Sequence, residues 1–580
     1  MKRLLLLSMI LMIGMSCISC NLGNQDNNVN NGNPNNSNNF LTSKIKFNFS
    51  GAKAVAQLDS SASRSASDDL NTFVKILSDG SFENAITING NISLRPVIAI
   101  YHSPVSDDVF VHFSGITSLG WDQKTNKEQC IGSLICVHSD GSIVDILKVR
   151  EHQVWWCRYL EYENLYQNLL TFDSAGNLYF VANNINYDSN GNQLSSSGNI
   201  LYQFNPVTNE LTQMVAGVEG TSYSKLQISN DGEWIFVQGS RWFGSTQTYF
   251  VRAIPADNPN NFTNIYYSSS NWVSDTGEWW VYDDNSNRLY YITTDGDNSG
   301  LFTVSRENNF KDKQFLRTSI GGNLYDLFQD FFDNIITSSQ LMEKIQISYS
   351  AEIELRIEEY ENNSTTSQWE YHTYINTDAL EMLKNKYSDS LIAQIQQYGN
   401  GGWEYFNAHS YYIYINGTNN YNFWDYFINY NSINQLSATT DGIYGRYFNG
   451  NKLCIIHIAD AEGNLIEENK KINLPSGKII DYKEYKNKIF LKYALTTSSG
   501  AELGYHHIYA VDLLANEYVN CFENVANRNA LEVVSYSIGA DRLYFSAVRG
   551  TAIENNVVDL LTNEANPLEV NRKMVAIYAF

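Results

Sequence analysis

The residues of this 580-residue chain that could perform chemistry fall into no catalytic motif. The chain has no Gly-x-Ser-x-Gly nucleophile elbow, no His-Glu-x-x-His zinc helix and no Gly-rich phosphate loop ending in Lys-Ser or Lys-Thr. His506 and His507 are the one adjacent histidine pair. Neighbouring strand residues point to opposite faces, so this pair cannot hold one metal ion together. The sequence therefore predicts no catalytic residue, no metal site and no cofactor.

Carboxylates are abundant, with 62 acidic residues against 39 basic ones. A glycosidase needs two of them at a suitable separation, but the sequence cannot select a pair. Oxygen ligands alternate as in calcium loops at Asp188, Asn190 and Asn192, and again at Asp295 and Asp297. Both stretches lack the downstream bidentate Glu of an EF-hand, and plain turns are the favoured interpretation.

The segment Tyr398–Tyr430 is the most suggestive candidate for binding, because thirteen of its residues are aromatic and Asn and Gly lie between them. Aromatic faces stack on rings and amides donate hydrogen bonds, which suits the recognition of a glycan or a protein. Half-buried strand packing explains the same pattern and is the more ordinary interpretation. The candidate binding residues are Trp403, Tyr405, Tyr411, Tyr412, Tyr414, Trp424 and Tyr426.

The N-terminus has the features of an export signal. Lys2 and Arg3 precede an apolar run, Leu4–Met15, that is too short to span a bilayer comfortably, and small residues and a cysteine follow. Residues 1–19 are therefore predicted to be a signal peptide.

The residues around Cys20 resemble the lipobox of bacterial lipoproteins, in which a small residue precedes a cysteine that becomes lipidated. Ser19 supplies the small residue, whereas Cys17 stands where the family usually has Leu. The resemblance implies lipidation of Cys20 and a membrane anchor on the cell envelope, at the outer membrane or cell surface. Lipidation of Cys17 and an ordinary signal peptide without lipid are the alternatives.

Residues 20–40 follow as the lipidated cysteine and a tether. Eleven of residues 21–40 are Asn, and no apolar periodicity is present, so the segment is predicted to be disordered. Such a tether would hold a folded domain away from the membrane.

The composition beyond the tether suits an exported all-β protein. Hydrophobic residues make up 43% of the chain and charged residues only 17%, with a net charge of −23 and no basic cluster in its body. Nucleic acid binding is excluded, because it needs Lys and Arg to displace phosphate counterions. Five cysteines remain, and either a disulfide among the first three or buried free thiols would fit: Cys130, Cys136, Cys157, Cys454 and Cys521.

A hairpin pattern recurs from about residue 71 to the C-terminus, and Lys225–Gly239 is its best copy. The turn Asn230–Gly232 separates two β-favouring runs, because Asp-Gly and Asn-Gly supply the positive φ angles that tight hairpins need. Trp234 and Phe236 share one strand face and are predicted to pack between neighbouring units. Many short strands in groups of four over residues 41–580 predict an all-β fold, a β-propeller of about seven or eight blades.

Two stretches resemble known propeller repeats. Ile228–Phe236 resembles the core of WD40-like repeats in TolB-type propellers, with Asn230 where that family has Pro, and Phe172–Phe180 resembles the D-x-x-G-N-L-Y blade turn. The resemblance implies the propeller fold and hints at envelope assembly, but it hardly bears on activity.

Residues 317–430 interrupt the repeat and are predicted to be a helix-containing insertion. Asn323–Gln346 has helical spacing, Gln346–Tyr360 alternates as a strand, and Trp369–Ile375 can return as its hairpin partner. A second helix is expected from Thr377 to about Tyr398. An odd blade with a long crossover is the alternative.

These features favour a membrane-anchored envelope lipoprotein whose propeller binds a protein or glycan partner. An envelope hydrolase or lyase that uses carboxylates in the propeller funnel is the alternative, and a structural subunit of envelope assembly is a third.

Overall fold

The fold comes from a computed structural model of the chain. It describes residues 43–580 except for 60–72, 152–156, 162–168, 188–192, 216–220, 269–278, 294–299, 319–330, 364–367, 386–410 and 421–434, and for shorter breaks of one to three residues. Statements of absence below refer to the residues that it describes.

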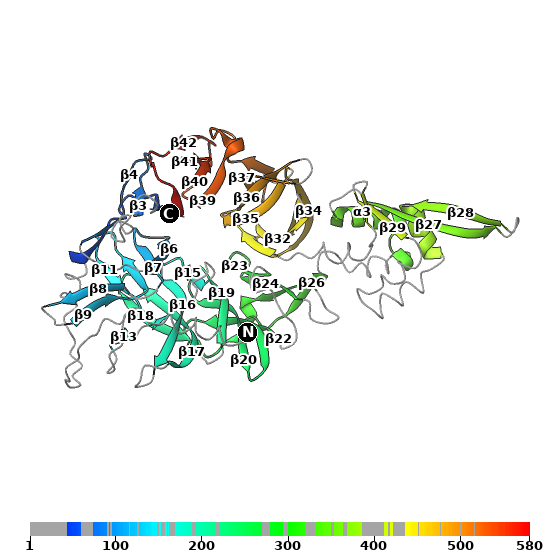
Figure 1. The fold of residues 1–580 in the computed structure, drawn as a ribbon. Helices are drawn as coiled ribbons and strands as arrows, with labels where there is room; N and C mark the ends of the chain where they lie inside the picture. The colour runs from blue at the N-terminus through cyan, green and yellow to red at the C-terminus, as the bar shows by residue number, and fades with distance from the viewer. Residues whose placement is uncertain are drawn as a thin grey trace, which may run out of the picture.

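Eight antiparallel blades, each built on four strands, follow one another in chain order and form a ring (Figure 1); the short strand β14 (Leu160–Glu161) adds a fifth strand to the third blade. The prediction of an all-β propeller is confirmed, with eight blades. From the inner strand outward, the first blade consists of β43 (Met574–Ala579), β2 (Ala54–Leu58), β3 (Phe73–Ile76) and β4 (Phe82–Asn84). The second blade consists of β6 (Val97–His102), β7 (Val109–Phe113), β10 (Leu134–Val137) and β11 (Ile143–Asp145). The third consists of β15 (Leu170–Phe172), β16 (Leu178–Tyr187), β17 (Gln193–Asn205) and β18 (Glu210–Val215), and the fourth of β19 (Thr221–Ile228), β20 (Trp234–Phe243), β21 (Thr246–Pro255) and β22 (Thr263–Ser268).

The other four blades have the same order of strands. The fifth blade consists of β23 (Trp280–Asp283), β24 (Arg288–Thr293), β25 (Gly300–Ser305) and β26 (Gln314–Thr318). The sixth consists of β31 (Gln435–Thr439), β32 (Gly442–Asn449), β33 (Lys452–Ala459) and β34 (Leu465–Asn473). The seventh consists of β35 (Gly477–Tyr485), β36 (Lys488–Thr496), β37 (Glu502–Asp512) and β38 (Glu517–Asn520), and the eighth of β39 (Glu532–Gly539), β40 (Arg542–Arg549), β41 (Ala552–Asp559) and β42 (Ala565–Pro567). Smaller elements decorate the ring: the pairs β1 (Ile45–Phe47) with β5 (Ile86–Ile88), β8 (Thr117–Asp122) with β9 (Lys127–Ile131) and β12 (Arg150–Glu151) with β13 (Cys157–Arg158), the short strand β14 (Leu160–Glu161), and the 3-10 turns η4 (Arg306–Asn308) and η6 (Arg528–Ala530).

The ring is closed by its two chain ends. The C-terminal strand β43 is the inner strand of the first blade, where it pairs with the N-terminal strand β2 from Ala54–Ala579 to Leu58–Met574. In Figure 1 the C-terminus lies beside β3 and β4. Because β43 also contacts β39 of the last blade and β6 of the second, it joins three blades.

Turn chemistry explains why the hairpins form where they do. In the turn after β15, Asp173 Oδ1 accepts the amides of Ala175 and Asn177 at 3.0 and 2.9 Å, and Gly176 has a φ of +82°. Asp460 makes the equivalent contacts in the sixth blade, with Glu462 and Asn464. The blade turn predicted from the D-x-x-G-N-L pattern is therefore a side-chain-capped turn, as Asx turns are.

The hairpin of β19 and β20 is also confirmed. Ser229 Oγ accepts the Trp234 amide at 2.9 Å and donates to Asp231 Oδ1 at 2.7 Å, while Gly232 adopts a φ of +72°. Phe236 stacks on Tyr282 of the next blade, with ring centroids 4.3 Å apart. The predicted packing of Phe236 between blades is confirmed, and the hydrophobic core as a whole lies between successive blades.

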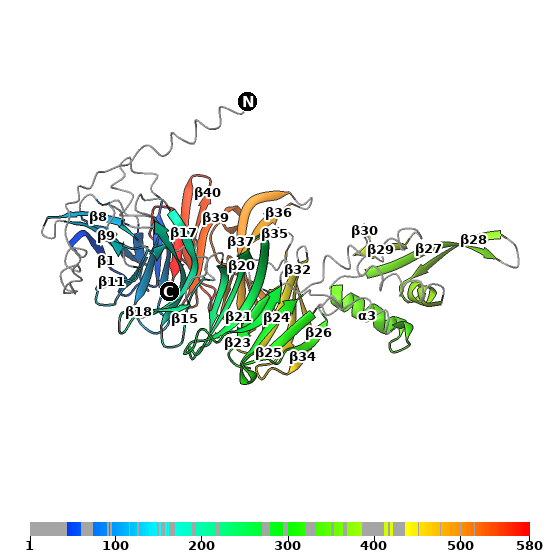
Figure 2. The same cartoon turned by 90° about the horizontal axis from the view of Figure 1, so that it is seen from below.

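The segment between β26 and β31 forms a separate small unit. It contains α3 (Ser338–Tyr349) and the sheet of β28 (Gln368–Ile375), β27 (Ile353–Asn363), β29 (Tyr411–Ile415) and β30 (Thr418–Asn420). Figures 1 and 2 both draw it outside the ring. β23 and β31 are in contact, so the fifth and sixth blades remain neighbours across the insertion.

Two details of the insertion differ from the sequence expectation. The helix expected over Asn323–Gln346 is interrupted at residues 333–337, and α3 begins only at Ser338. The predicted strand Gln346–Tyr360 is wrong in its first part, because α3 continues to Tyr349 and β27 begins only at Ile353. Buried Leu341 and Met342 hold the helix in place. Extending a formed helix by a few residues is favourable, even though the added residues up to Tyr349 have the alternating pattern of a strand. The hairpin of β27 with β28 is confirmed. A second helix begins at residue 377 as predicted and is described to residue 385.

Among the helices of the described residues, none combines the length and the apolar character that a membrane span requires.

We expect Gly477→Ala to lower the free energy of unfolding by about 2 kcal/mol or more. A Cβ at Gly477 would lie 2.2 Å from the buried Tyr493 ring and 2.4 Å from the Ala494 carbonyl, so β35 would have to move away from β36. Gly504→Ala is the matched control, because Gly504 has a φ of +75° but open space around it, and should cost only about 1 kcal/mol. Denaturant unfolding of both variants measures the difference, and equal losses would contradict the packing argument.

Candidate functional site

The inner strands of five blades surround a cavity of about 730 Å³ in the centre of the ring. These strands are β6, β15, β35, β39 and β43, and Lys492 of β36 also contributes. The sheet registers shift at Val97–Ala99 in β6, Ile479–Asp481 in β35 and Val533–Ser535 in β39. Such bulges bend a strand and free backbone groups from the ladder, so they shape the wall locally.

Two lysines and one aspartate are the charged groups among the described residues of the cavity wall. Lys483 Nζ donates to the Tyr536 carbonyl at 2.7 Å and lies 4.4 Å from the centre of the Tyr536 ring. Lys492 Nζ donates to the Val533 carbonyl at 2.8 Å, at the bulge of β39. Each ammonium group has three donors, so both lysines retain donors for a ligand.

Asp481 lies opposite Lys492 across β35 and β36, and its Oδ2 accepts the Tyr536 hydroxyl at 3.1 Å. Burial lowers the pKa of Lys483; the charge of Asp481 opposes this shift, and the charge of Lys492 adds to it. Burial also lowers the pKa of Lys492, which Asp481 again opposes. The wall therefore has one net positive charge inside a protein whose net charge is −23.

Aromatic residues form much of the remaining wall, in Tyr101, Phe172, Tyr536 and Tyr578. The Tyr101 hydroxyl is buried and has no hydrogen-bond partner within the described structure. Burial raises the pKa of Tyr101 and raises that of Tyr578 to about 12, so both hydroxyls are neutral donors near pH 7. A buried hydroxyl without a partner is costly unless a ligand or water satisfies it.

The arrangement can bind, but it offers no pair of carboxylates. Asp481 is the single carboxylate of the described wall, and a second cavity of about 520 Å³ at the edge of the eighth blade has only Glu554. Glycoside hydrolysis of the usual kind needs two carboxyl groups on either side of the scissile bond.

A neighbouring network positions β35, the strand that carries Asp481 and Lys483. The buried Arg446 guanidinium of the sixth blade donates to Gln435 and Ser437 of β31 and to Glu484 of β35. The Gln435 side-chain amide also donates to the Tyr482 hydroxyl of β35 at 3.1 Å. Loss of Arg446 would remove the buried cation that links Gln435 and Ser437 of β31 to Glu484 of β35, so we regard it as a positioning residue.

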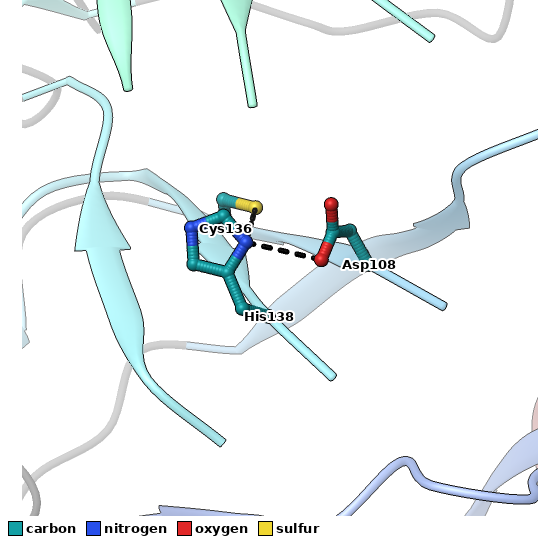
Figure 3. Close-up of side chains that lie close together, drawn as sticks. All are labelled: Asp108, Cys136 and His138. Atoms are coloured by element: carbon teal, nitrogen blue, oxygen red, sulfur yellow. Dashed lines mark hydrogen bonds and ion pairs between the residues drawn. The ribbon is translucent and has the colours of Figure 1, made fainter. Parts of the chain in front are cut away.

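A second cluster lies at the end of the second blade, where Asp108, Cys136 and His138 converge (Figure 3). His138 Nδ1 lies 3.0 Å from Asp108 Oδ1 and 3.9 Å from Cys136 Sγ, and Nε2 lies 3.0 Å from Asn209 Oδ1 of the third blade. Burial raises the pKa of the Cys136 thiol, and Asp108 adds to this. In a Cys-His-Asp nucleophilic triad the thiol and the carboxylate contact different ring nitrogens, so this arrangement is not a triad.

The candidates from the sequence fall largely elsewhere. Tyr411, Tyr412 and Tyr414 lie on β29, where Tyr412 pairs with Arg356 and Tyr414 with Glu354 of β27. The remaining candidates lie outside the described residues, namely Trp403, Tyr405, Trp424, Tyr426, Cys17, Cys20 and the two possible calcium loops. The aromatic binding surface and the lipid anchor therefore stay predictions.

The histidine pair behaves as alternation requires. His506 Nδ1 accepts a hydrogen bond from the Val533 amide of β39 at 3.1 Å, whereas His507 Nδ1 lies 3.2 Å from Nδ2 of Asn520 on β38. Of the cysteines, Cys136 and Cys521 are buried free thiols.

Sequence reasoning missed the cavity lysines and the Asp108 cluster. Lys492 stands within an otherwise apolar strand, and Cys136 and His138 are two residues apart on a predicted strand, so both had a local signal. What the sequence could not show is which blades bring them against Tyr536, Asp108 and Asn209.

Comparison with known proteins finds distant structural similarity. No family model and no curated protein matches the chain. Among solved structures, the β-propeller domain of the Trilobed protease from Pyrococcus furiosus aligns over 70% of this chain and 98% of its own, at 10% identity and a TM-score of 0.24. A putative 6-phosphogluconolactonase from Bacteroides fragilis aligns over 83% and 97%, at 10% identity and 0.30, and an oligogalacturonate lyase from Vibrio parahaemolyticus over 80% and 97%, at 8% and 0.33.

These similarities are too low to carry an argument about fold or activity. The topology of the blades defines the class of protein, an eight-bladed β-propeller.

We expect Lys483 and Lys492 to lose their protons at a lower pH than exposed lysines do, whose pKa is near 10.4. Burial disfavours the ammonium form of both, so the midpoints should fall below that value. Reductive ¹³C-methylation followed by NMR titration measures the midpoints, and Lys483→Met and Lys492→Met assign the signals. Midpoints at or above 10.4 would contradict the burial of these two ammonium groups.

Proposed function

We propose that this protein is a binding module of a bacterial cell envelope, and that its propeller takes an acidic glycan in the central cavity. The single observation that carries the proposal is the pair Lys483 and Lys492 in an aromatic-walled cavity of an otherwise acidic protein. A volume of about 730 Å³ suits a small ligand, since ligand pockets measure roughly 300–1,000 Å³.

The chemistry of the wall selects the ligand class. Lysine ammonium groups pair with a carboxylate, tyrosine rings stack on a sugar face, and the Tyr101 hydroxyl and Asp481 supply a donor and an acceptor for hydroxyl groups. A uronate-containing saccharide has all three matching features: a carboxylate, sugar faces and hydroxyl groups.

The export signal and lipobox-like residues support membrane anchoring as the second part of the proposal. Lipid on Cys20 and the Asn-rich tether would place the propeller at the envelope surface, where acidic glycans are accessible. The insertion with its aromatic segment would then offer a separate surface for a protein or glycan partner.

Lys483→Met and Lys492→Met should each weaken binding of a uronate disaccharide at least about tenfold, because a hydrogen bond to a charged group contributes roughly 1.5–3 kcal/mol. Lys478→Met is the matched control, since Lys478 lies on the same strand but is exposed and paired with Glu502. Calorimetric titration with glucuronate- and galacturonate-containing disaccharides, against their neutral counterparts, measures the effect. Equal binding of neutral and acidic sugars, or an equal loss in Lys478→Met, would refute the role of the lysine pair.

Cys20→Ser should abolish incorporation of labelled palmitate and release the protein from membranes, because lipid attachment needs the thiol. Cys17→Ser should leave both unchanged and is the control at the alternative position. Metabolic labelling and membrane fractionation of the full chain measure the two effects. Label that persists in Cys20→Ser, or no label in the unaltered protein, would exclude lipidation at Cys20.

A further inference from the structure

We propose that Asp108, Cys136 and His138 form a site for a divalent cation of the zinc class, at the junction of the second and third blades. The proposal is independent of the glycan cavity, which lies between the inner strands, and it rests on the convergence of one oxygen, one sulfur and one nitrogen ligand (Figure 3).

The sheet itself brings the three ligands together. Val137 of β10 pairs with Val109 of β7, so the next step of the ladder sets His138 opposite Asp108. Cys136 precedes His138 by two residues and therefore lies on the same strand face. Cys136 lies on β10, and Asp108 and His138 lie one residue beyond the ends of β7 and β10, so two adjacent strands of one blade position all three.

The separations of the ligand atoms suit a small tetrahedral ion. All three atoms lie within 4.8 Å of one another, with His138 Nδ1 3.0 Å from Asp108 Oδ1 and 3.9 Å from Cys136 Sγ. Zinc bonds of about 2.0–2.3 Å place tetrahedral ligands roughly 3.4–3.6 Å apart. To hold the ion, the His138–Asp108 pair would have to widen from 3.0 Å, and the longer separations, which do not exceed 4.8 Å, would have to shorten.

The surrounding contacts orient the ligands as outer contacts of metal sites do. Asn209 Oδ1 lies 3.0 Å from His138 Nε2, and an N–H donated from Nε2 to this oxygen would leave the Nδ1 lone pair facing Asp108 and Cys136. Ser106 Oγ donates to Asp108 Oδ2 at 2.9 Å and leaves Oδ1 for the ion. In that tautomer three electron-rich atoms would face one point, where a cation would satisfy them together.

The burial of the ligands fits a site with one open position. Cys136 is fully buried, whereas the side chains of His138 and Asp108 retain 17% and 14% exposure. Three protein ligands and a solvent-accessible fourth position are typical of zinc sites that bind water or a ligand group.

Cobalt(II) substitution tests the proposal on the full chain after removal of metal by a chelator. One equivalent of Co²⁺ should produce a sulfur-to-cobalt charge-transfer band and the visible bands of a tetrahedral ion. Cys136→Ser should abolish the charge-transfer band, while Cys521→Ser, which removes another buried thiol, should leave it unchanged.

Two further variants guard against misfolding of Cys136→Ser. Asp108→Asn should weaken zinc binding at least tenfold in calorimetric titration. Asn209 has a positive φ, which glycine tolerates, so Asn209→Gly should leave the turn intact. This variant should weaken zinc binding about 10–100-fold, because it removes the contact that orients His138. If the unaltered protein gives no sulfur band, or if the band survives Cys136→Ser, the cluster is a set of hydrogen-bonded side chains and the metal proposal is wrong.

Discussion

The pairing of β43 with β2 is the interaction on which the rest of the structure depends. A propeller blade buries its faces only against its neighbours, so an open ring would expose two of them. β43 prevents this by completing the first blade with the last residues of the chain, from Met574 to Ala579. The same strand supplies Tyr578 to the cavity wall, and Tyr578 donates to the Ile98 carbonyl of the second blade at 3.3 Å. Closure of the ring and formation of the site are therefore one event.

The cavity combines groups that burial would disfavour in isolation. Lys483 and Lys492 are held by carbonyl oxygens of β39, and Asp481 accepts from Tyr536, so each charge has a partner that stabilises it. The bulge of β39 lies at Val533, whose carbonyl accepts the hydrogen bond from Lys492. A site formed in this way is rigid, because its residues lie on strands rather than on loops.

The insertion and the ring are organised by different constraints. β23 and β31 pack together although 117 positions separate Thr318, which ends β26, from Gln435, which begins β31, so the ring forms without regard to the length of the insertion. Entropy of loop closure grows only slowly with length, which explains why a propeller tolerates a whole sheet between two blades. A surface that carries recognition can therefore change in the insertion without disturbing the cavity.

The sequence by itself determined the repeat, because turn chemistry and strand alternation act over a few residues. Asp173 and Asp460 cap their turns through contacts within five residues, and Phe236 faces the next blade by alternation alone. The helix boundary at Tyr349 was missed because helix extension depends on the buried contacts of Leu341 and Met342. Only the tertiary structure decided the number of blades, the strand that closes the ring, and the meeting of Lys483 with Tyr536 or of His138 with Asn209. Those contacts join residues 53 and 71 positions apart, and no local pattern specifies which blade a side chain will face.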